Sequence, residues 1–250
     1  MKERSISIII PAFHFADSLY KVIQSIQSQS VTFLEIIVVD SSNNEEVLKV
    51  VRDTEFNSLN INYIKVDKAF PGEARNIGAK EAKGDWLAFL DSKTVPEEDW
   101  LETCFKIIDI QKKEIVFGLT EYKGKTDFQK ILQAATFGKI GHETTPGSVI
   151  KKEIYRNSNS FIEGVRTADD LFWRNKLKFR GFNWHTPEKL TLTYSELPQS
   201  YWEILKRYFI YSWHTSRVNV QNNMKDLYFG ILLILSALIV PRWNSLVGWE

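Results

Sequence analysis

Short apolar runs alternate with amphipathic stretches along the first 120 residues of the chain. The apolar runs have the length and β-branched content of buried strands, and they lie at Ile6–Pro11, Leu34–Val39, Ile61–Val66, Asp85–Leu90 and Glu114–Leu119. Between them, apolar residues recur with the helical period, which predicts helices at Ala16–Gln29, Asn44–Phe56, Pro71–Lys83 and Pro96–Gln111. This alternation is typical of parallel strands joined by right-handed crossovers. The predicted fold class is α/β, with a Rossmann-like, mostly parallel sheet flanked by helices.

Beyond residue 120 the pattern loosens. It predicts helices at Thr126–Phe137 and Asp169–Phe179, a loop at Gly138–Gly147, a short strand near Ser148–Lys151 and an amphipathic helix at Pro198–Val218. We therefore expect one domain over residues 1–197, in which the second half, from residue 121, is an elaboration packed on the sheet. Residues 198–250 form a C-terminal helical extension.

The extension contains an uncharged apolar run at Leu227–Val240. This run is shorter than the roughly 20 residues that a membrane-spanning helix needs. Two hypotheses stay open: residues 198–250 associate with a membrane, as an interfacial segment or an abbreviated span, or they form a helix that the protein or a partner covers. The tryptophans and tyrosines around the run suit both a membrane interface and an aromatic core.

Composition and charge exclude several classes of protein. The 32 basic and 31 acidic side chains leave a net charge of +1, so the broad basic field of a nucleic-acid-binding protein is absent and no nucleic-acid partner is expected. The single cysteine, Cys104, excludes an internal disulfide and is typical of a reducing compartment. The N-terminal sequence lacks the features of a signal peptide. We expect a cytoplasmic protein, at the cytoplasmic face of a membrane if the extension docks there.

Polar residues directly follow the predicted strands, where ligands bind in sheets of this kind. Asp40 and Ser42 follow the second strand, and they suit either a hydrogen bond to a nucleobase or the cap of the next helix. Asp91, Ser92 and Lys93 follow the fourth strand. A lone carboxylate in that position suits a ribose hydroxyl or a divalent cation.

Two helix starts carry further candidate chemistry. Gly72 and Arg75 lie in the first turns of the helix predicted from Pro71, where free N–H groups and a forked cation would bind a diphosphate; an ordinary helix start with a paired arginine is the alternative. Asp169 and Asp170 open another helix. Their residue types alone favour stabilisation of the helix terminus over proton transfer from an acceptor hydroxyl.

Taken in order, these segments resemble the family 2 glycosyltransferases of the GT-A fold. The resemblance covers about residues 5–215 and is carried by IIIPAF (8–13), SIQSQ (25–29), EIIVVDSS (35–42), GEARNIGAKEAKGDWLAFLDS (72–92) and TADDLFWRNKLKFRGF (167–182). It implies an inverting transferase that takes a sugar from a nucleoside diphosphate, UDP in particular. The acceptor would be a glycan, a lipid-linked molecule or a small hydroxyl compound.

The resemblance implies that residues 1–120 form a nucleotide-binding half and residues 121–197 an acceptor half. It also implies roles for individual residues. Asp170 would be the general base that takes the acceptor hydroxyl's proton. The donor would be bound by Pro11, Phe13, Asp40, Ser42, Gly72, Arg75, Asn76, Asp91, Ser92 and Lys93. The acceptor side would include Gly147, Ser148, Glu163 and Asp169.

Two positions depart from the family pattern and leave the need for Mg²⁺ or Mn²⁺ open. Lys93 stands where the family carries a second metal-binding carboxylate, and the segment Thr193–Glu196 lacks the histidine that many relatives have, the nearest being His185 and His214. One hypothesis is that Lys93 replaces the cation. Another keeps a metal through Asp91, with Glu196 or the diphosphate. A third is a non-catalytic domain that binds nucleotide sugars, although an intact base at Asp170 argues for catalysis.

Overall fold

The computed structural model describes residues 4–158, 160–218, 220 and 231–235. Within them the strands are β1 (Ile6–Ala12), β2 (Glu35–Asp40), β3 (Ile61–Lys65), β4 (Trp86–Phe89), β5 (Thr94–Pro96), β6 (Ile115–Tyr122), β7 (His142–Lys151), β8 (Trp184–His185) and β9 (Leu192–Tyr194). The helices are α1 (Ala16–Gln27), α2 (Glu46–Val51), the 3-10 turn η1 (Thr54–Phe56), α3 (Pro71–Glu81), α4 (Trp100–Gln111), α5 (Asp127–Thr136), α6 (Lys152–Asn157), α7 (Asp169–Phe179) and α8 (Tyr201–Thr215).

All the strands belong to one sheet with the order β3-β2-β1-β4-β7-β6-β9-β5, and β8 pairs with β6. Strands β3, β2, β1 and β4 are parallel, as the alternating pattern predicts. Strand β7 is antiparallel to both β4 and β6, and β5 is antiparallel to β9. The sheet is therefore parallel from β1 to β4 and mixed in its second half.

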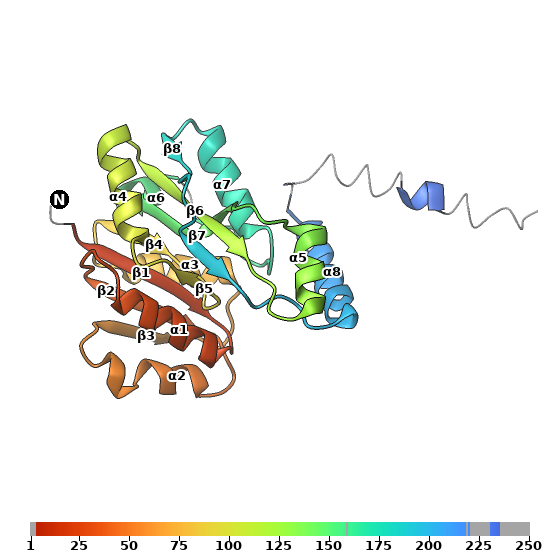
Figure 1. Cartoon of the computed structure of the whole chain (residues 1–250). Coiled ribbons are helices and arrows are strands. Elements are labelled where there is room, and N and C mark those ends of the chain that lie inside the picture. The colour runs from red at the N-terminus through yellow and green to blue at the C-terminus, as the bar shows by residue number, and fades with distance from the viewer. Residues whose placement is uncertain (1–3, 159, 219, 221–230, 236–250) are drawn as a thin grey trace, which may run out of the picture.

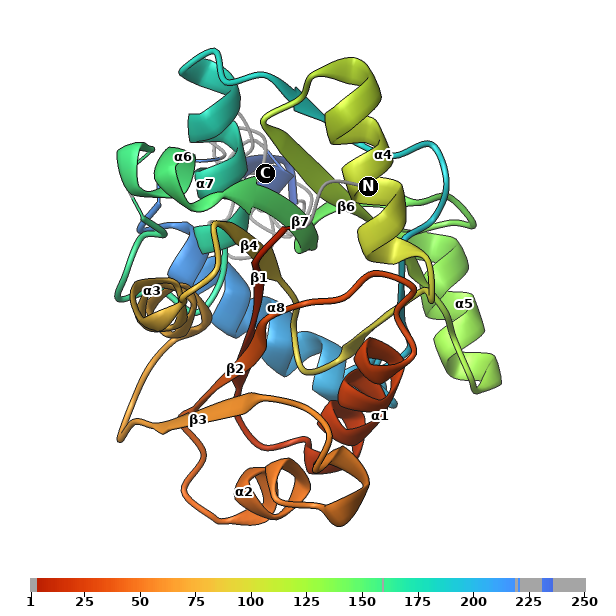
Figure 2. The ribbon, with the colours of Figure 1, turned by 90° about the vertical axis from the view of Figure 1, so that its left-hand side faces the viewer.

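Helices cover both faces of the sheet (Figure 2). On one face, apolar side chains of α1, α2 and α4 pack against the strands in a core that includes Ile8, Ile23 and Trp100. On the other face, α3, α6 and α7 form a second core that includes Ile9 and Trp173. Neighbouring residues of β1 thus point into different cores, so this strand is buried on both sides. Such burial explains why the first strands are continuous apolar runs rather than alternating ones.

Three predicted elements differ from the structure. The helix predicted over Asn44–Phe56 is interrupted, because the Asp53 side chain accepts a hydrogen bond from the Glu55 N–H and starts the separate turn η1. Pro96 does not begin a helix but ends β5, which pairs with β9. The predicted loop at Gly138–Gly147 is wrong from residue 142 onward, since His142–Lys151 forms the long strand β7.

The C-terminal extension begins as predicted with a helix, α8. Most of the apolar run Leu227–Val240 lies outside the described residues; residues 231–235 are helical and their side chains are exposed. Among the described residues, no helix has the length and apolar character needed to span a membrane. In Figure 1, α5 and α8 lie together at the end of the molecule toward which β1 points.

Candidate active site

Arg75 links two acidic residues that are distant in sequence. It extends from the first turns of α3, and its two terminal nitrogens donate to the Asp169 Oδ2 at 2.7 Å and to the Asp91 Oδ1 at 2.6 Å. Its guanidinium also lies over the ring of Phe161, at 5.2 Å from the centroid. Arg75 is almost fully buried, and although burial disfavours its charge, the carboxylates around it raise its pKa above the usual value. The predicted site residues Arg75, Asp91 and Asp169 therefore meet.

Gly72 is what allows α3 to approach Asp169 this closely. A Cβ added at Gly72 would lie 2.6 Å from the carbonyl oxygen of Ile162 and 3.2 Å from the Asp169 Oδ2. Asp169 itself is buried, and burial raises its pKa to about 7, with further contributions from Asp170 and Asp91 that Arg75 opposes. Asp169 is thus a buried partner of Arg75 rather than a group that faces an acceptor.

Asp170 is the second residue of α7 and is half-buried. Its backbone carbonyl accepts a hydrogen bond from the Thr145 hydroxyl at 3.3 Å. Among the residues that the structure describes, no ion pair engages the Asp170 carboxylate, in contrast to its neighbour Asp169. Its charge acts on both Arg75 and Tyr122, which locates it at the same cluster. Of the two adjacent acids, Asp170 is the more exposed, and Arg75 pairs with Asp169 instead.

Asp40 ends β2 and is fully buried, with four hydrogen-bond donors around it. They are the Ser42 N–H at 2.8 Å, the Ser42 hydroxyl at 2.5 Å, the Tyr63 hydroxyl at 2.7 Å and the Lys65 ammonium at 3.1 Å. Burial alone would raise the pKa of Asp40, but these bonds lower it below its usual value. The helix-cap alternative is wrong, because α2 begins later, at Glu46. A hydrogen bond between Asp40 and the nucleobase of a donor stays a prediction, and it would require one of these four bonds to change.

The loop after β1 is held in a strained conformation beside Lys93. His14 and Phe15 both have positive φ angles, 58° and 55°, which side chains with a Cβ rarely adopt. The His14 N–H donates to the Ser42 hydroxyl at 2.7 Å, so Ser42 connects the loops after β1 and β2. In the same segment, Pro11 is half-buried and Phe13 is half-exposed. The guanidinium of Arg166 lies 5.9 Å from the centroid of the Phe13 ring. Strain of this kind is concentrated at ligand sites.

Lys93 lies against this loop, with its ammonium nitrogen 3.1 Å from the centroid of the Phe15 ring. Burial lowers the pKa of Lys93 to about 8, and the nearby cation Arg207 acts in the same direction, while Glu196 and Asp91 oppose it. Ser92, beside it, is buried. Lys93 is therefore a partly desolvated cation at the rim that carries Asp91.

Sequence reasoning missed three side chains that surround Lys93 and Asp170. Tyr122 and Tyr194 lie with their ring centroids 5.3 Å apart, and burial raises the pKa of Tyr194 to about 12. Arg207 comes from α8 and hydrogen-bonds to Tyr194. These residues lie on β6, β9 and α8, and no motif around them indicated that they converge.

Two predicted binding residues hold the protein's own chain instead. The Asn76 side-chain amide donates to the Phe161 carbonyl and to Glu163, each at 2.9 Å, and its oxygen accepts from the Tyr155 hydroxyl and the Phe161 N–H. With both ends of the amide engaged, Asn76 fixes the segment that leads to α7. Glu163, predicted on the acceptor side, takes part in the same attachment.

Gly147 and Ser148, also predicted on the acceptor side, lie inside β7. Ser148 is fully buried, and the Gly147 carbonyl accepts a hydrogen bond from the Trp100 indole at 2.8 Å. Gly147 has φ +85°, and an added Cβ would lie 2.1 Å from Leu192. The structure gives both residues a packing role, because the expected open loop is a strand.

The donor groups around Asp91 do not fit a divalent cation. Metal ions of this type bind several oxygen ligands, but Arg75 already holds Asp91 and the Lys93 ammonium stands nearby. Glu196, the other acid considered, is paired with Lys125 at 2.9 Å. Within the described part of the chain, no group of three or more histidine, cysteine, aspartate or glutamate side chains is arranged to bind a metal ion.

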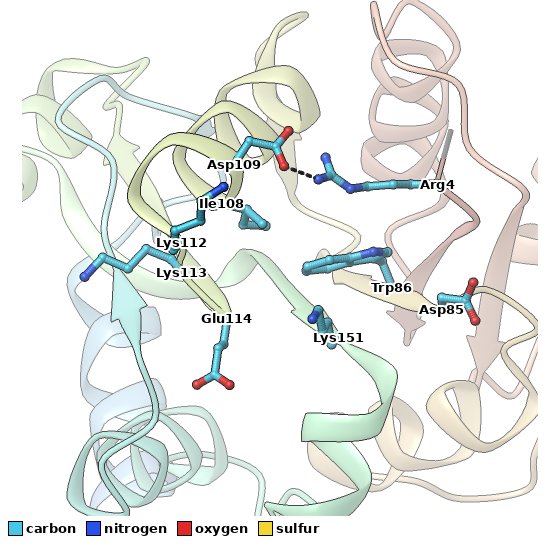
Figure 3. Close-up of a pocket in the computed structure, with 9 residues that line it drawn as sticks. All are labelled: Arg4, Asp85, Trp86, Ile108, Asp109, Lys112, Lys113, Glu114 and Lys151. Carbon is cyan, nitrogen blue, oxygen red and sulfur yellow. Dashed lines mark hydrogen bonds and ion pairs between the residues drawn. The ribbon is translucent and has the colours of Figure 1, made fainter. Parts of the chain in front are cut away.

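A cavity of about 510 Å³ lies at the opposite, amino-terminal edge of the parallel strands (Figure 3). There Arg4 pairs with Asp109 and lies over the ring of Trp86, with Lys151 on the other side of the ring. The cavity is lined by both cationic and carboxylate side chains, so neither sign of charge dominates it. None of the predicted donor or acceptor residues lines it.

A comparison with protein families matches residues 7–169, more than half of the chain, to the model described as Glycosyl transferase family 2. The chain belongs to this family. TarP, a poly(ribitol-phosphate) beta-N-acetylglucosaminyltransferase of Staphylococcus aureus, is 26% identical over 186 residues, which cover 72% of this chain and 54% of TarP. WfaP of Escherichia coli, a UDP-Glc:alpha-D-GlcNAc-diphosphoundecaprenol beta-1,3-glucosyltransferase, is 30% identical over 128 residues, which cover 49% of this chain and 48% of WfaP. The chain thus spans about half the length of these two relatives.

Solved structures of similar fold include two transferases. S. aureus TarS 1-349 in complex with UDP-GlcNAc has a TM-score of 0.62 at 19% identity, over 78% of this chain and 60% of that one. The mannosyltransferase PcManGT from Pyrobaculum calidifontis, in complex with GDP-Man and Mn²⁺, has a TM-score of 0.63 at 19% identity, over 80% of this chain and 59% of that one. Both have the GT-A fold, so the predicted fold class is confirmed.

Proposed function

We propose that this chain transfers a sugar from a nucleoside diphosphate, UDP in particular, to a hydroxyl acceptor with inversion at the anomeric carbon. The proposal depends on one observation above all. Arg75 joins Asp91 to Asp169, and Lys93 lies against Phe15, near the carboxyl ends of β1 and β4, where parallel sheets of this type bind ligands. TarS, of similar fold, was solved with UDP-GlcNAc, which favours a UDP-sugar donor.

In this proposal residues 1–120 bind the donor. Pro11, Phe13 and the loop fixed by Ser42 lie beside the base, and Lys93 faces the diphosphate, while buried Arg75 holds Asp91 and Asp169 in place behind it. A partly buried ammonium stabilises the charge that develops on the departing diphosphate more strongly than a fully hydrated one, because less water screens it. Since the groups around Asp91 suit no divalent cation, the proposed reaction uses the charge of Lys93 directly.

Asp170 is the proposed general base. Its carboxylate accepts the proton of the acceptor hydroxyl as that oxygen attacks the anomeric carbon, while the bond to the diphosphate breaks. Arg75 holds Asp169 in place and thereby positions the first turn of α7, which carries Asp170. Residues 121–197 supply the acceptor side, including the tyrosines Tyr122 and Tyr194. A glycan or lipid-linked acceptor is the proposed class, since WfaP acts on a diphosphoundecaprenol-linked sugar.

We place the reaction in the cytoplasm, because Cys104 is an unpaired, buried thiol. The Lys93 substitution also favours a second candidate, a domain that binds nucleotide sugars without turnover. The two functions differ in one measurable respect, which is the need for a base.

The test is turnover of a panel of UDP-, GDP- and dTDP-sugars by the Asp170→Asn variant, with and without Mn²⁺ or chelator. We expect donor affinity to persist and turnover to fall by about 10²–10⁴-fold, the usual contribution of a positioned base. Asp127→Asn is the matched control, because Asp127 also lies in the first turn of a helix but is exposed on α5. It should leave turnover unchanged.

Equal turnover of Asp170→Asn and the unmodified chain would rule out the base assignment. Donor binding without turnover for any donor and acceptor would establish the binding-only alternative. Turnover that disappears with chelator and returns with Mn²⁺ would show that Lys93 does not replace a cation.

A further inference from the structure

Helix α8 exposes several large apolar side chains. Trp202, Phe209 and Trp213 are 77%, 74% and 57% exposed, and Leu205 is 41% exposed. Their spacing of three and four residues aligns them along one side of the helix. We call these four residues the α8 stripe. A continuous exposed patch of this kind marks a surface that binds another partner.

The opposite side of α8 faces the candidate active site. The His214 ring lies 5.3 Å from the ring of Phe70, directly before α3, and its Nδ1 accepts a hydrogen bond from the Arg166 N–H at 3.2 Å. The Thr167 hydroxyl donates to the Tyr211 carbonyl at 3.3 Å. The helix is therefore anchored on the segments that carry Arg75 and Asp170, while the stripe points away from them.

We propose that the α8 stripe docks this protein on an anionic lipid surface. Tryptophan, phenylalanine and leucine on one side of a helix, with lysine and arginine beside them, is the composition of helices that lie in a membrane interface. Two exposed cations, Lys206 and Arg217, stand beside the stripe, and the one acid of the helix, Glu203, is already paired with Arg207 at 3.2 Å. This balance complements anionic headgroups.

The course of the chain supports the same partner. Beyond α8 the sequence continues into the apolar run Leu227–Val240, whose described residues 231–235 are exposed. Two apolar segments in succession, one of them flanked by cations, fit a lipid surface better than a small protein patch. Docking through α8 would place this helix between the bilayer and the donor-binding rim. The docking itself does not depend on the proposed sugar transfer.

Binding of the full chain to vesicles tests this proposal. We expect co-sedimentation with phosphatidylcholine vesicles that contain phosphatidylglycerol, and weaker binding to phosphatidylcholine alone. The double variant Trp202→Gln/Phe209→Gln should lower the partition coefficient by at least about tenfold, because two large rings no longer enter the interface. Lys206→Glu/Arg217→Glu should lower binding to the anionic vesicles by about tenfold or more.

The control variant is Ile110→Gln/Phe179→Gln. It removes two side chains that are 79% and 93% exposed on α4 and α7, away from α8. It should bind vesicles like the unmodified chain. A second measurement places the contact on α8 itself: a fluorophore sensitive to polarity is attached through Ser212→Cys, which is feasible because Cys104 is buried. Its emission should shift to the blue with vesicles, whereas the same label at Phe179→Cys should not respond.

Three results would overturn the proposal. The first is no binding of the unmodified chain to either vesicle. The second is equally tight binding of the Trp202→Gln/Phe209→Gln variant, which would locate the contact outside the α8 stripe. The third is a dimer that forms without lipid and dissociates in that variant, which would make a second copy the occupant of the α8 stripe. Melting curves that match between variants show that the folded protein is compared in each case.

Discussion

Replacement of Arg75 by methionine tests the electrostatic cluster at the centre of the candidate site. Arg75 and Asp169 are both 3% exposed, and their charged groups are joined at 2.7 Å. Two unit charges about 4 Å apart interact by about 4 kcal/mol at an effective dielectric constant of about 20. Removal of the arginine leaves a buried carboxylate without its cation, a change that destabilises proteins by about 3–5 kcal/mol. We expect Arg75→Met to lower the free energy of unfolding by that amount.

The loss should depend on pH in a defined direction. Burial already raises the pKa of Asp169 to about 7 in the presence of Arg75, and the pKa rises further when the opposing cation is removed. Between the unfolded value of about 4 and this raised value, the folded state binds a proton that the unfolded state does not. Stability of the variant therefore increases as the pH falls, and the effect of Arg75→Met should be smaller near about pH 5.5 than near about pH 8.

Urea unfolding at both pH values measures these differences. The double variant Arg75→Met/Asp169→Asn removes the buried charge and should recover part of the stability, with a coupling energy of about 1–3 kcal/mol. Lys189→Met is the control, because it removes an exposed ion pair with Asp99 and should have a far smaller effect. If Arg75→Met is no more harmful than Lys189→Met, or if Asp169→Asn brings no recovery, the buried pair does not hold the site together.

Three further predictions concern single residues. The pKa of Lys93 is lowered to about 8, so UDP affinity measured by calorimetry should be constant below that pH and fall by up to about tenfold near pH 9. Lys93→Arg should abolish this pH dependence. If the pH profile of Lys93→Arg equals that of the unmodified chain, Lys93 is not the titrating group. Gly72→Ala should lower the free energy of unfolding by about 1–3 kcal/mol, since the new methyl group would lie 2.6 Å from the Ile162 carbonyl oxygen. An unchanged free energy in urea unfolding would contradict that contact. Cys104 should resist thiol reagents in the native protein and react in urea, because it is fully buried and burial raises the pKa of its thiol; rapid native labelling would argue against its position in the core.

The apolar periodicity and the helix-start signals of the sequence were sufficient to predict several helices and strands. Helix α7 occupies the predicted range Asp169–Phe179, and β1, β2 and α3 agree with the predictions to within two residues at each end. These segments combine a clear apolar period with a recognisable start or end, such as Pro71 in the first turn of α3. The parallel order of the first strands follows from their alternation with helices.

The elements that sequence analysis missed depend on distant partners. Residues 142–147 contain threonine, proline and glycine, which locally favour a loop, yet they extend β7 because β6 pairs with it. Thr94–Pro96 is a strand only because Leu192–Tyr194 lies beside it. Such pairings override local preference, and neither segment carries a sign of its partner.

The same limit applies to the site. The order of the motifs predicted Arg75, Asp91 and Asp169 as site residues, each in a different segment. Their contact with one another depends on α3 lying against α7, which no local pattern indicates. The interaction of Lys93 with Phe15 depends on the positive φ angles of His14 and Phe15, which ordinary residue preferences argue against. Asn76 matched a binding motif, and only the contacts with Phe161 and Tyr155 reveal that it holds the chain together.

A structure of the full chain with a bound UDP-sugar tests most directly whether the carboxyl-terminal rim of the sheet is the donor site. We predict a diphosphate oxygen within hydrogen-bond distance of the Lys93 Nζ, about 2.7–3.2 Å, with the Phe15 ring displaced from the ammonium and the sugar facing Asp170. A donor bound in the cavity lined by Arg4 and Lys151, at the other edge of the sheet, would contradict the assignment of the site.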